Sequence, residues 1–316
     1  MKLSLVVPCY NEEPNIPLFY NAVKSDFAQA DFDYEIVFVN DGSKDGTLAE
    51  LKKLCAGDIP LRIVDFSRNF GKEAAMSAGL REATGDFVTV IDADLQQQPA
   101  IALEMLKILD AEPDYDCVAA YQENRKESKL LIFFKDSFYK LINKFSDTNF
   151  TQGASDFRTF RRRMVDSILE MQEYFRFSKG IFSWVGYNTK YIPYEVQERA
   201  AGTSKWSFSK LFKLALEGIL AFTTAPLRVA TVLGSVTSLL SIIYLIIVIV
   251  QKLVFGIAVE GYATIVVLIL LLGGIQLCCI GIIGEYIART YIQTKGRPIY
   301  IARQVITNEQ NTQKQD

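Results

Sequence analysis

Two long apolar stretches near the carboxyl end constrain this chain more than any other feature of its sequence. Residues 229–250 contain no Asp, Glu, Lys or Arg, and neither do residues 261–284. A helix rises about 1.5 Å per residue, so each stretch is long enough to cross the roughly 30 Å hydrocarbon layer of a bilayer. Buried helices of soluble proteins rarely stay apolar on every side for this length. The sequence therefore predicts two transmembrane helices.

The charged residues around these stretches predict the orientation of the chain. Asp and Glu outnumber Lys and Arg in residues 1–198, whereas Lys and Arg dominate residues 199–303. The basic residues that flank the two stretches are Lys205, Lys210, Lys213, Arg228, Arg289, Lys295, Arg297 and Arg303. By the positive-inside rule, both flanks lie in the cytoplasm and the short connection lies outside. Residues 3–8 are too short for a signal peptide. We therefore expect a plasma or inner membrane protein with both termini cytoplasmic.

The sequence contains no histidine, which excludes several kinds of catalytic site. Ser-His-Asp and Cys-His catalysis and metal sites built from imidazole all require this residue. The five cysteines show no CxxC spacing, and their odd number does not suggest a disulfide framework. Catalysis in this chain must therefore depend on carboxylates, on cationic side chains and on a metal bound by oxygen.

Residues 1–120 alternate short apolar runs with helical patterns, which predicts a parallel sheet covered by helices. The expected strands are 2–8, 34–40, 61–67, 87–92 and 116–120, and the expected helices are 15–30, 44–56, 72–83 and 99–110. In open α/β sheets, ligands bind beyond the carboxyl ends of the strands. The residues directly after these strands are therefore the first candidates for chemistry.

Two basic segments with interleaved aromatic residues could lie at the membrane surface. In residues 129–145, lysines alternate with Leu, Ile, Phe and Tyr at near-helical spacing, and residues 204–225 have a similar pattern. Amphipathic helices of this kind lie in the interface plane. A surface helix over the α/β core explains the first segment equally well, whereas the second leads directly into a span and favours the membrane. Residues 307–316 are polar, which is typical of a disordered tail.

Asp92 and Asp94 end the apolar strand expected at 87–92. Two carboxylates one residue apart at a strand end can reach one divalent cation, and Mg²⁺ or Mn²⁺ prefers such oxygen ligands. A cation at this position would neutralise the charge on a departing diphosphate. An ordinary loop rich in Asp would show the same pattern, so the pair alone indicates a metal site without establishing one.

Polar residues also follow the first two expected strands. Asp41 opens the turn DGSKDGT, where glycines allow a ligand to approach and the carboxylate can accept hydrogen bonds from a base or ribose. The same turn could simply start a helix, with Ser43 or Asp45 as its N-cap. Tyr10 and Glu12 could hold a nucleobase, although turn chemistry also explains their stretch. Neither GxxxxGK[ST] nor GxGxxG is present, which excludes a P-loop and a dinucleotide fingerprint.

Two later groups of polar residues allow a functional and a structural interpretation. Asp156 could be a general base, or it could simply pair with Arg158. Arg199 and Lys205 stand close to Gly202 just before the membrane segments. Such cations could bind a diphosphate or a lipid phosphate, or they could face lipid headgroups. The residues alone leave both alternatives open.

In their order and spacing, these motifs resemble the inverting family-2 glycosyltransferases of the GT-A fold. Within that family the chain is similar to the polyprenyl-phosphate glycosyltransferases, which include dolichyl-phosphate mannose synthases and bactoprenol glucosyltransferases. The matching text is VVPCYNEE at 6–13, VNDGSKDGT at 39–47, SRNFGKEAAMSAG at 67–79, GDFVTVIDADLQQQP at 85–99, SDFRTF at 155–160, RAAGTSKW at 199–206, TTAPLR at 223–228 and the closing GEYIARTY and KGRPIY. The resemblance covers nearly the whole chain, and the two spans narrow it to the bactoprenol glucosyltransferase type. A QxxRW motif is missing after the Asp156 region, which disfavours processive polysaccharide synthases.

The resemblance implies an architecture and a set of site residues. It implies a Rossmann-like GT-A catalytic domain at 1–203, interfacial helices at 204–228, transmembrane helices at 229–250 and 261–284, and a cytoplasmic tail at 285–316. It also implies that Asp156 is the catalytic base and that Asp92 and Asp94 hold the metal, with Asp92 also at the ribose-diphosphate. The implied nucleoside contacts are Pro8, Tyr10, Glu12 and Asp41. The implied contacts to the donor or acceptor phosphates are Arg125, Arg199, Ser204 and Lys205.

The function that follows from the resemblance is an inverting transfer of a hexose from a nucleotide sugar to a polyprenyl phosphate. Glucose from UDP-glucose, undecaprenyl phosphate and Mg²⁺ or Mn²⁺ are the expected donor, acceptor and cofactor. The alternatives are GDP-mannose or UDP-GlcNAc as donor, another lipid as acceptor, or a non-catalytic membrane scaffold. No nucleic-acid partner is expected. Gly274, Cys278 and Gly281 form a small-residue face on the second span, which would permit a homo-oligomer.

Overall fold

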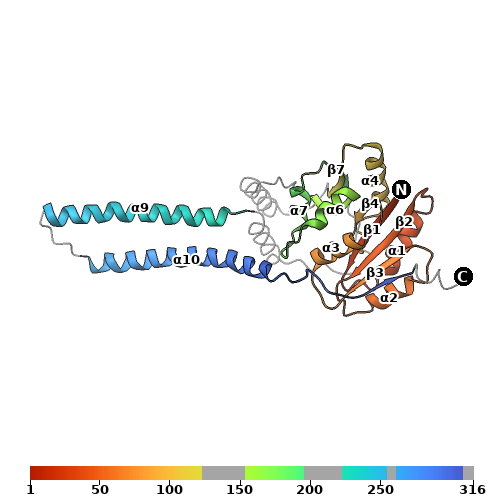
Figure 1. Cartoon of the computed structure of the whole chain (residues 1–316), viewed down its shortest axis with the longest axis horizontal. Coiled ribbons are helices and arrows are strands. Elements are labelled where there is room, and N and C mark those ends of the chain that lie inside the picture. Colours follow the sequence, from red (N-terminus) through yellow and green to blue (C-terminus); the bar gives the residue numbers. More distant parts are fainter. Residues whose placement is uncertain (123–153, 196–222, 255–260, 309–316) are drawn as a thin grey trace.

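The computed structural model describes residues 1–122, 154–195, 223–254 and 261–308. An α/β domain forms one end of the molecule, and two long helices project from it side by side (Figure 1). The expected combination of a Rossmann-like α/β domain and two apolar carboxyl-terminal helices is therefore confirmed.

The α/β domain is built on one eight-stranded mixed sheet with the strand order β7-β5-β6-β4-β1-β2-β3-β8. Its strands are β1 (Lys2–Cys9), β2 (Asp33–Asn40), β3 (Leu61–Phe66), β4 (Phe87–Val90), β5 (Cys117–Gln122), β6 (Ala154–Arg161), β7 (Thr189–Tyr194) and β8 (Ala302–Thr307). All five expected strands form, within two residues of their predicted ends. The sheet is nevertheless not wholly parallel, because β6 runs antiparallel between β4 and β5 and β8 runs antiparallel beside β3.

Helices cover both faces of the sheet, because side chains along a strand point alternately to opposite faces. Leu3, Leu5 and Val7 of β1 belong to a core shared with one set of helices, whereas Val6 packs into the core on the other face. The first set is α1 (Asn15–Asp26), α2 (Thr47–Leu54) and α4 (Pro99–Ala111). The second set is α3 (Lys72–Glu82), α6 (Arg162–Glu170) and α7 (Ser178–Trp184). The result is a three-layer α/β/α domain.

Helix α3 lies unusually close to the centre of the sheet. A Cβ atom added to Gly79 would come within 2.2 Å of Val6 Cγ1, so only glycine fits at this crossing. Ala74, Ala75 and Ala78 continue the same small-residue surface and are buried against the sheet. This close packing holds the first residue of α3, Lys72, near the carboxyl ends of the central strands.

Strand β8 returns the chain from the second long helix to the edge of the sheet. The segment from 285 onward, expected as a tail, thus includes the end of α10 (Tyr262–Thr294) and an added strand. Tyr300 stacks on Phe66 with ring centroids 4.9 Å apart, and Asn308 accepts a hydrogen bond of 2.8 Å from the Leu61 amide. These contacts attach the segment that follows α10 to the α/β domain.

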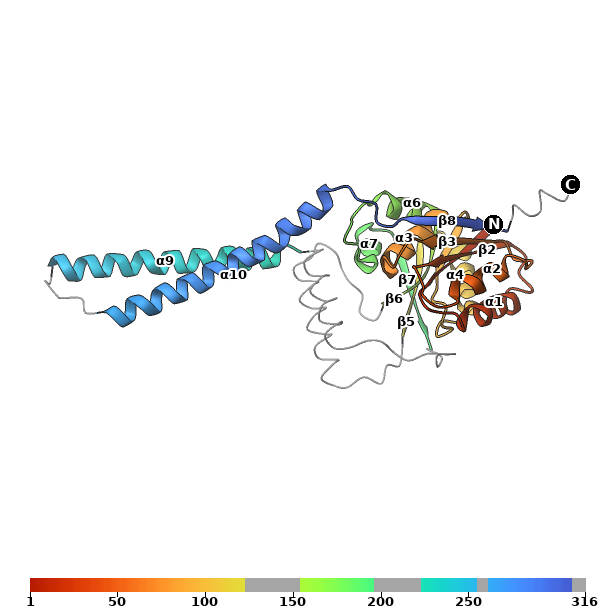
Figure 2. The same ribbon diagram turned by 90° about the horizontal axis from the view of Figure 1, so that it is seen from below.

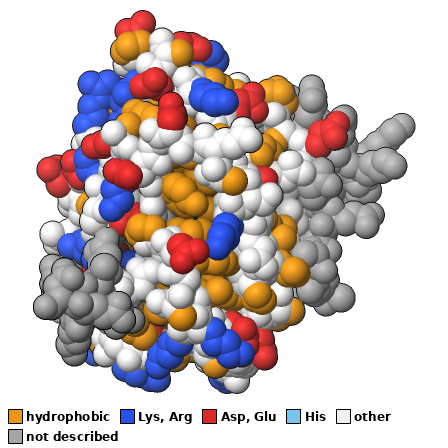
Figure 3. Space-filling view, turned by 90° about the vertical axis from the view of Figure 1, so that its right-hand side faces the viewer, with side chains coloured by type: hydrophobic (Ala, Val, Ile, Leu, Met, Phe, Trp, Pro, Cys, Tyr) orange, Lys and Arg blue, Asp and Glu red, His pale blue; other side chains and the backbone are white. Residues whose placement is uncertain are grey.

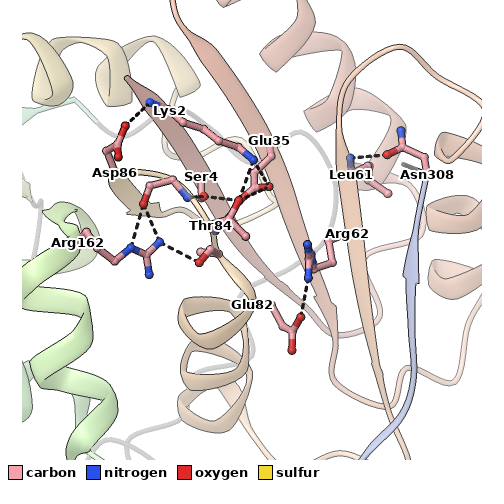
Figure 4. A network of polar contacts seen from close by, with 12 residues as sticks. Lys2, Ser4, Glu35, Leu61, Arg62, Glu82, Thr84, Asp86, Arg162 and Asn308 are labelled. Atoms are coloured by element: carbon pink, nitrogen blue, oxygen red, sulfur yellow. Dashed lines mark hydrogen bonds and ion pairs between the residues drawn. The ribbon is translucent and has the colours of Figure 1, made fainter. Parts of the chain in front are cut away.

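A buried carboxylate joins neighbouring strands at the amino-terminal ends of β1 and β2 (Figure 4). Glu35 accepts hydrogen bonds from Lys2 Nζ (2.8 Å), Ser4 Oγ (2.6 Å) and the Thr84 amide (2.7 Å). Burial alone would raise the pKa of Glu35, but these donors outweigh it and lower the pKa below its usual value. This network joins β1, β2 and the turn before β4 at the end of the sheet away from the catalytic candidates.

The two projecting helices are α9 (Ala225–Val254) and α10, and they cross in the view of Figure 2. The Tyr286 hydroxyl of α10 donates a 2.8 Å hydrogen bond to the carbonyl of Thr223, which lies just before the start of α9. Most of their Leu, Ile and Val side chains are exposed, as lipid-facing residues would be. Residues 225–251 and 267–294 are long and apolar enough to cross a membrane, which agrees with the prediction of two apolar helices; the second of these ranges lies later in the chain than the predicted 261–284.

Candidate functional site

Most of the predicted site residues that the structure describes lie just beyond the carboxyl ends of β1, β2 and β4. Asp41 follows β2, and Asp92 and Asp94 follow β4. Asp156 lies near the start of β6, which runs in the opposite direction and therefore brings its amino-terminal end to the same edge. Val90 pairs with Arg158, and continuing that antiparallel register by two residues places Asp92 beside Asp156. Two carboxylates far apart in the sequence are thus brought together.

Lys72 bridges these two carboxylates, although it was not among the predicted site residues. Its ammonium group lies 2.6 Å from Asp92 Oδ1 and 3.5 Å from Asp156 Oδ2. Burial opposes its charge, but the two carboxylates outweigh burial and raise the pKa of Lys72 above its usual value. Lys72 belongs to the quoted stretch SRNFGKEAAMSAG, yet a lysine at a helix start is too common for its position alone to identify a site residue.

Asp156 is held in its ionised form. Burial would raise its pKa, but the positive charges of Lys72, Lys179 and Arg158 outweigh burial and lower the pKa below the usual range of an aspartate. A carboxylate in this state is a weak proton acceptor. It is well suited to orienting a hydrogen-bond donor or balancing a cation.

The two aspartates of the DxD motif are held by a tight turn after β4. The Gln97 side-chain oxygen accepts a 2.9 Å hydrogen bond from the Asp92 amide, which fixes the backbone of Asp92. Asp94 Oδ1 accepts a 3.2 Å hydrogen bond from the Gln96 amide. Leu95 has a φ of 59°, in the left-handed region, so the backbone turns directly after Asp94. The turn presents two carboxylates and keeps the chain from continuing as a strand.

The donor set at this turn fits a hard divalent cation that is shared with a ligand. The described residues contain no group of three or more His, Cys, Asp or Glu side chains that could hold a metal by themselves. Asp92 and Asp94 supply two carboxylates, and Mg²⁺ commonly binds through one or two carboxylates while substrate phosphates and water complete its shell. The residues therefore suit a cation that binds together with a diphosphate. Asp92 would have to exchange its contact with Lys72 for such a cation.

Asp41 is buried, and the loop before α3 engages both of its carboxylate oxygens. It accepts hydrogen bonds from the Phe70 amide (2.6 Å), the Gly71 amide (3.0 Å) and the Asn69 side-chain amide (2.9 Å). Burial raises the pKa of Asp41, and the Phe70 and Gly71 amides only partly offset it. Asp41 therefore holds the loop that carries Lys72. Its predicted contact with a nucleoside stays a prediction.

Hydrogen bonds join the turn after β1 to the turn after β2. The Asn11 amide donates to Ser43 Oγ (3.0 Å), and Asn11 Oδ1 accepts from the Lys44 amide (2.9 Å). Asn11 has a φ of 55°, which asparagine tolerates better than most residues. Next to it, Tyr10 is 38% exposed, so its ring is accessible to a ligand. Glu12 accepts a 2.6 Å hydrogen bond from Asn15 Nδ2.

Glu73 is a second residue near the site, after Lys72, that sequence reasoning missed. It accepts hydrogen bonds from the Ser178 amide (2.8 Å) and the Ser178 hydroxyl, which connects the start of α3 to the start of α7. Burial and the nearby negative charge of Asp156 raise the pKa of Glu73 to about 7. Its neighbour Lys72 forms the carboxylate bridge, so Glu73 lies directly behind the candidate site.

The remaining predicted site residues are Pro8, which is partly buried, and the phosphate contacts, which lie outside the described residues. Pro8 is partly buried in β1, where it pairs with Val39 of β2. The predicted phosphate contacts Arg125, Arg199, Ser204 and Lys205 lie outside the described residues, as do the amphipathic segments at 129–145 and most of 204–225.

Two known families match separate parts of the chain. The family described as "Glycosyl transferase family 2" matches residues 4–169, which include β1 through most of α6 and all of the predicted site residues in the described α/β domain. The "GtrB C-terminal hairpin" matches residues 225–290, which include α9 and most of α10. The division between the two matches agrees with the division between the α/β domain and the apolar helices.

Curated relatives resemble the chain over almost its whole length. A putative glycosyltransferase, CsbB, of Bacillus subtilis is 43% identical over 96% of this chain and 91% of its own length. A prophage bactoprenol glucosyl transferase homolog of Escherichia coli is also 43% identical, over 96% of this chain and 99% of its own length. Among solved structures, a mannosyltransferase of Pyrobaculum calidifontis in complex with GDP-Man and Mn²⁺ is 21% identical with a TM-score of 0.47, covering 69% of this chain and 61% of that chain.

Proposed function

Because this chain belongs to glycosyl transferase family 2, we propose that it transfers a hexose from a nucleotide sugar to a polyprenyl phosphate at the membrane. Glucose from UDP-glucose is the proposed donor group, and undecaprenyl phosphate is the proposed acceptor. The observation that carries this proposal is the combination, in one chain, of a carboxylate-lined site and two apolar helices that project from the same α/β domain. The bactoprenol glucosyl transferases among the relatives support the choice of lipid acceptor.

The proposed reaction is a single in-line displacement. A phosphate oxygen of the acceptor forms a bond to the anomeric carbon while the bond from that carbon to the donor diphosphate breaks. The bonding electron pair leaves with the nucleoside diphosphate, and the anomeric configuration inverts. A phosphate monoester has its second pKa near 6, so the acceptor is already largely dianionic at neutral pH. No proton has to be removed from it.

Asp156 and Lys72 would therefore position charge rather than transfer a proton. Asp156 is held ionised by its cationic neighbours, and a weak base is sufficient for an acceptor that carries no proton. Lys72 lies between the two carboxylates and can place its positive charge beside the phosphates of donor and acceptor. This arrangement would reduce repulsion between the dianionic acceptor and the donor diphosphate.

Asp92 and Asp94 would hold Mg²⁺ or Mn²⁺ together with the donor diphosphate. When bound, such a cation stabilises the negative charge of the departing nucleoside diphosphate. Gln97 fixes the backbone of Asp92, so the motif is oriented before any ligand arrives. Pro8, Tyr10, Glu12 and Asp41 are the proposed nucleoside contacts, and the exposed ring of Tyr10 suits stacking on a base. Arg125, Arg199, Ser204 and Lys205 remain the proposed phosphate contacts.

The two apolar helices would hold the site at the level of the lipid phosphate. Confining the enzyme to the surface that carries its acceptor raises the effective concentration of that acceptor without any new contact. We further propose that the catalytic domain and both termini lie in the cytoplasm, as the flanking basic residues indicate. The small-residue face of α10 would support a homo-oligomer.

One experiment tests the reaction class, the acceptor and the sugar together. Purified protein in nanodiscs is incubated with undecaprenyl phosphate, Mg²⁺ or Mn²⁺, and a panel of UDP- and GDP-sugars, with and without EDTA. The lipid products are identified by mass. The expected result is a hexosyl phospholipid that forms from UDP-glucose and disappears with EDTA. If product formed only from GDP-mannose or only from UDP-GlcNAc, that nucleotide sugar would be the donor in place of UDP-glucose.

Absence of product with every donor would overturn the proposed acceptor. A parallel incubation with diacylglycerol would then detect a different lipid acceptor. A folded protein that binds no nucleotide sugar in equilibrium dialysis would identify a membrane scaffold instead of an enzyme.

A further inference from the structure

The segment between α6 and the end of α7 carries exposed aromatic side chains that the proposed reaction does not use. Phe175 is 36% exposed and Trp184 is 62% exposed. In residues 1–122 and 154–195, the only other exposed large apolar side chains are Met1, Tyr10 and Leu18, which are scattered along the chain. We call residues 172–184 the aromatic segment. Two exposed aromatic side chains in so short a segment require an explanation.

The aromatic segment is bonded directly to the second apolar helix. Gln293 of α10 accepts a 2.8 Å hydrogen bond from the Tyr174 amide and donates a 3.0 Å hydrogen bond to the Gln172 carbonyl. The guanidinium of Arg289 lies 4.9 Å from the centre of the Phe175 ring. Three contacts therefore hold the aromatic segment at the level of residues 289–293 of α10.

That level begins in the headgroup layer of the bilayer, at Arg289. Glu285 is the first charged residue after the uncharged stretch 261–284, so it marks the end of the hydrocarbon layer. At about 1.5 Å per residue, Arg289 lies about 6 Å beyond Glu285 and Gln293 about 12 Å beyond it. The headgroup region on each side of the hydrocarbon is about 5–8 Å thick, and any tilt of α10 shortens its rise along the membrane normal. Arg289, which contacts Phe175, therefore lies within the headgroup layer, and Gln293 lies just beyond it.

Helix α7 turns one side toward the protein and the other away from it. Ile181 and Phe182 are buried, and Phe182 packs on Phe160 with ring centroids 4.9 Å apart. Trp184 follows Phe182 by two residues, about 200° around the helix, and therefore points to the opposite side. In both ribbon views α7 lies on the side of the domain that faces α9 and α10 (Figures 1 and 2).

We propose that the aromatic segment is a membrane-docking surface whose side chains Phe175 and Trp184 insert into the lipid headgroup layer beside α10. Tryptophan favours this layer because its ring is apolar while its indole N–H can still meet water or a headgroup. The contacts of Gln293 and Arg289 make this surface continuous with the membrane-spanning helix. The opposite end of the domain shows acidic and basic side chains around a central group of hydrophobic ones (Figure 3).

Docking at this surface would fix the distance between the membrane and the candidate site. Ser178 begins α7 and donates to Glu73, the neighbour of Lys72. Lys179, the next residue of α7, is one of the charges that lower the pKa of Asp156. The helix that would rest on the lipid is therefore also the helix that lies behind the site.

Tryptophan fluorescence tests this proposal without altering the docking residues. The chain has two tryptophans, Trp184 and Trp206. The variant W206F, or W206Y if W206F does not fold, leaves Trp184 as the single reporter in the full-length protein. The protein is placed in nanodiscs of neutral and anionic lipids, with or without lipids brominated near the headgroup end of their acyl chains. Collisional quenching by soluble acrylamide is measured in parallel.

The expected result is a blue-shifted Trp184 emission, strong quenching by the brominated lipids and weak quenching by acrylamide. The matched control is L18W in a W184F/W206F background, because Leu18 is also exposed (45%) but lies on α1, away from the spans. Its fluorescence loss with brominated lipids should be several times smaller, and its acrylamide quenching stronger.

Two outcomes would overturn the proposal. Trp184 that is quenched by acrylamide as readily as the Leu18 control, and not by brominated lipids, would show that the surface faces water. Trp184 that is protected from both quenchers would show that protein covers it, such as a second copy of this chain. Neither outcome depends on whether the protein transfers a sugar.

Discussion

The ammonium nitrogen of Lys72 lies 2.6 Å from a carboxylate oxygen of Asp92, the first aspartate of the DxD motif. The same nitrogen is 3.5 Å from Asp156, so one lysine forms ion pairs with both carboxylates. A divalent cation that binds Asp92 must displace this contact. Lys72 would then be released toward the phosphates at the moment the donor arrives.

Replacing Lys72 with methionine should separate its competition with a cation for Asp92 from its contribution to turnover. Without the competing ammonium, Asp92 becomes more available, so Lys72→Met should bind Mn²⁺ more tightly in the absence of a donor. Turnover should fall about 100-fold, the usual loss when a charge that stabilises the transition state is removed. Mn²⁺ affinity is measured by electron paramagnetic resonance and turnover by lipid-product mass.

The matched control is Lys52→Met, which removes an exposed lysine from α2. It should leave both values unchanged. Weaker Mn²⁺ binding by Lys72→Met would contradict the idea that Lys72 and the cation compete for Asp92.

The substitution Asp156→Asn distinguishes positioning from proton abstraction. Because its cationic neighbours lower the pKa of Asp156, this group stays ionised across the neutral range. The rate should instead rise with pH through about 6, where the acceptor phosphate loses its second proton. Asp156→Asn should lower turnover and keep that rise at the same pH, as measured by pH–rate profiles of both proteins.

The exposed Asp110 on α4 provides the control, and Asp110→Asn should match the unaltered protein. Loss of the rise near pH 6 in Asp156→Asn would assign the titration to Asp156 and support a general base. Near-normal turnover would remove both roles from Asp156.

Asp94→Ala should abolish metal-dependent turnover. Removing one of two carboxylates leaves a divalent cation with too few protein ligands to hold it beside a diphosphate. Metal retention is measured by equilibrium dialysis with Mn²⁺ and UDP, and turnover with and without EDTA. The exposed neighbour Gln98 serves as the control through Gln98→Ala. EDTA-sensitive turnover that persists in Asp94→Ala would refute the metal assignment.

Glu73 should make stability fall as the pH rises toward neutrality. Its folded-state pKa is raised to about 7. An unfolded glutamate has a pKa of about 4.3, so the folded protein binds the proton more tightly between these values. The stability contributed by the protonated form is present below about pH 4.3 and is lost as the pH rises through about 7.

Glu73→Gln keeps an acceptor for Ser178 but cannot ionise, so this part of the pH dependence should disappear. Thermal unfolding in nanodiscs at several pH values measures the effect. Glu104→Gln, an exposed change on α4, should keep the dependence of the unaltered protein. A Glu73→Gln profile identical to that of the unaltered protein would contradict the expected titration.

Glu35→Ala should destabilise the α/β domain by about 1–3 kcal/mol, because its buried donors lose a charged acceptor. The pKa of Glu35 is lowered in the folded state, so its contribution is present above the unfolded pKa and is lost as the pH falls through the folded pKa. The difference in free energy of unfolding between Glu35→Ala and the unaltered protein should therefore become smaller at acidic pH. Chemical unfolding at neutral and acidic pH measures it, and an equal difference at both would contradict the assignment.

Local patterns in the sequence were sufficient for much of the fold. The alternation of apolar runs and helical periods placed β1 through β5 and α1 through α4 within a few residues of their ends. The uncharged stretches identified both long helices, because their length and apolar composition are those of membrane spans. The DxD motif was recognisable because Asp92 and Asp94 directly follow an apolar strand. Each of these features depends on residues close together in the chain.

The site itself depends on contacts between residues that are far apart. Only the antiparallel register of β4 and β6 brings Asp156 beside Asp92, and only the close crossing of α3 over β1 at Gly79 carries Lys72 to both. The return of β8 to the edge of the sheet and the bonds from Gln293 to the aromatic segment are equally long-range. The sequence by itself determined which elements form and which chemical groups they carry. The tertiary structure decided which of those groups meet, because sheet register and helix packing are set by burial across the whole domain.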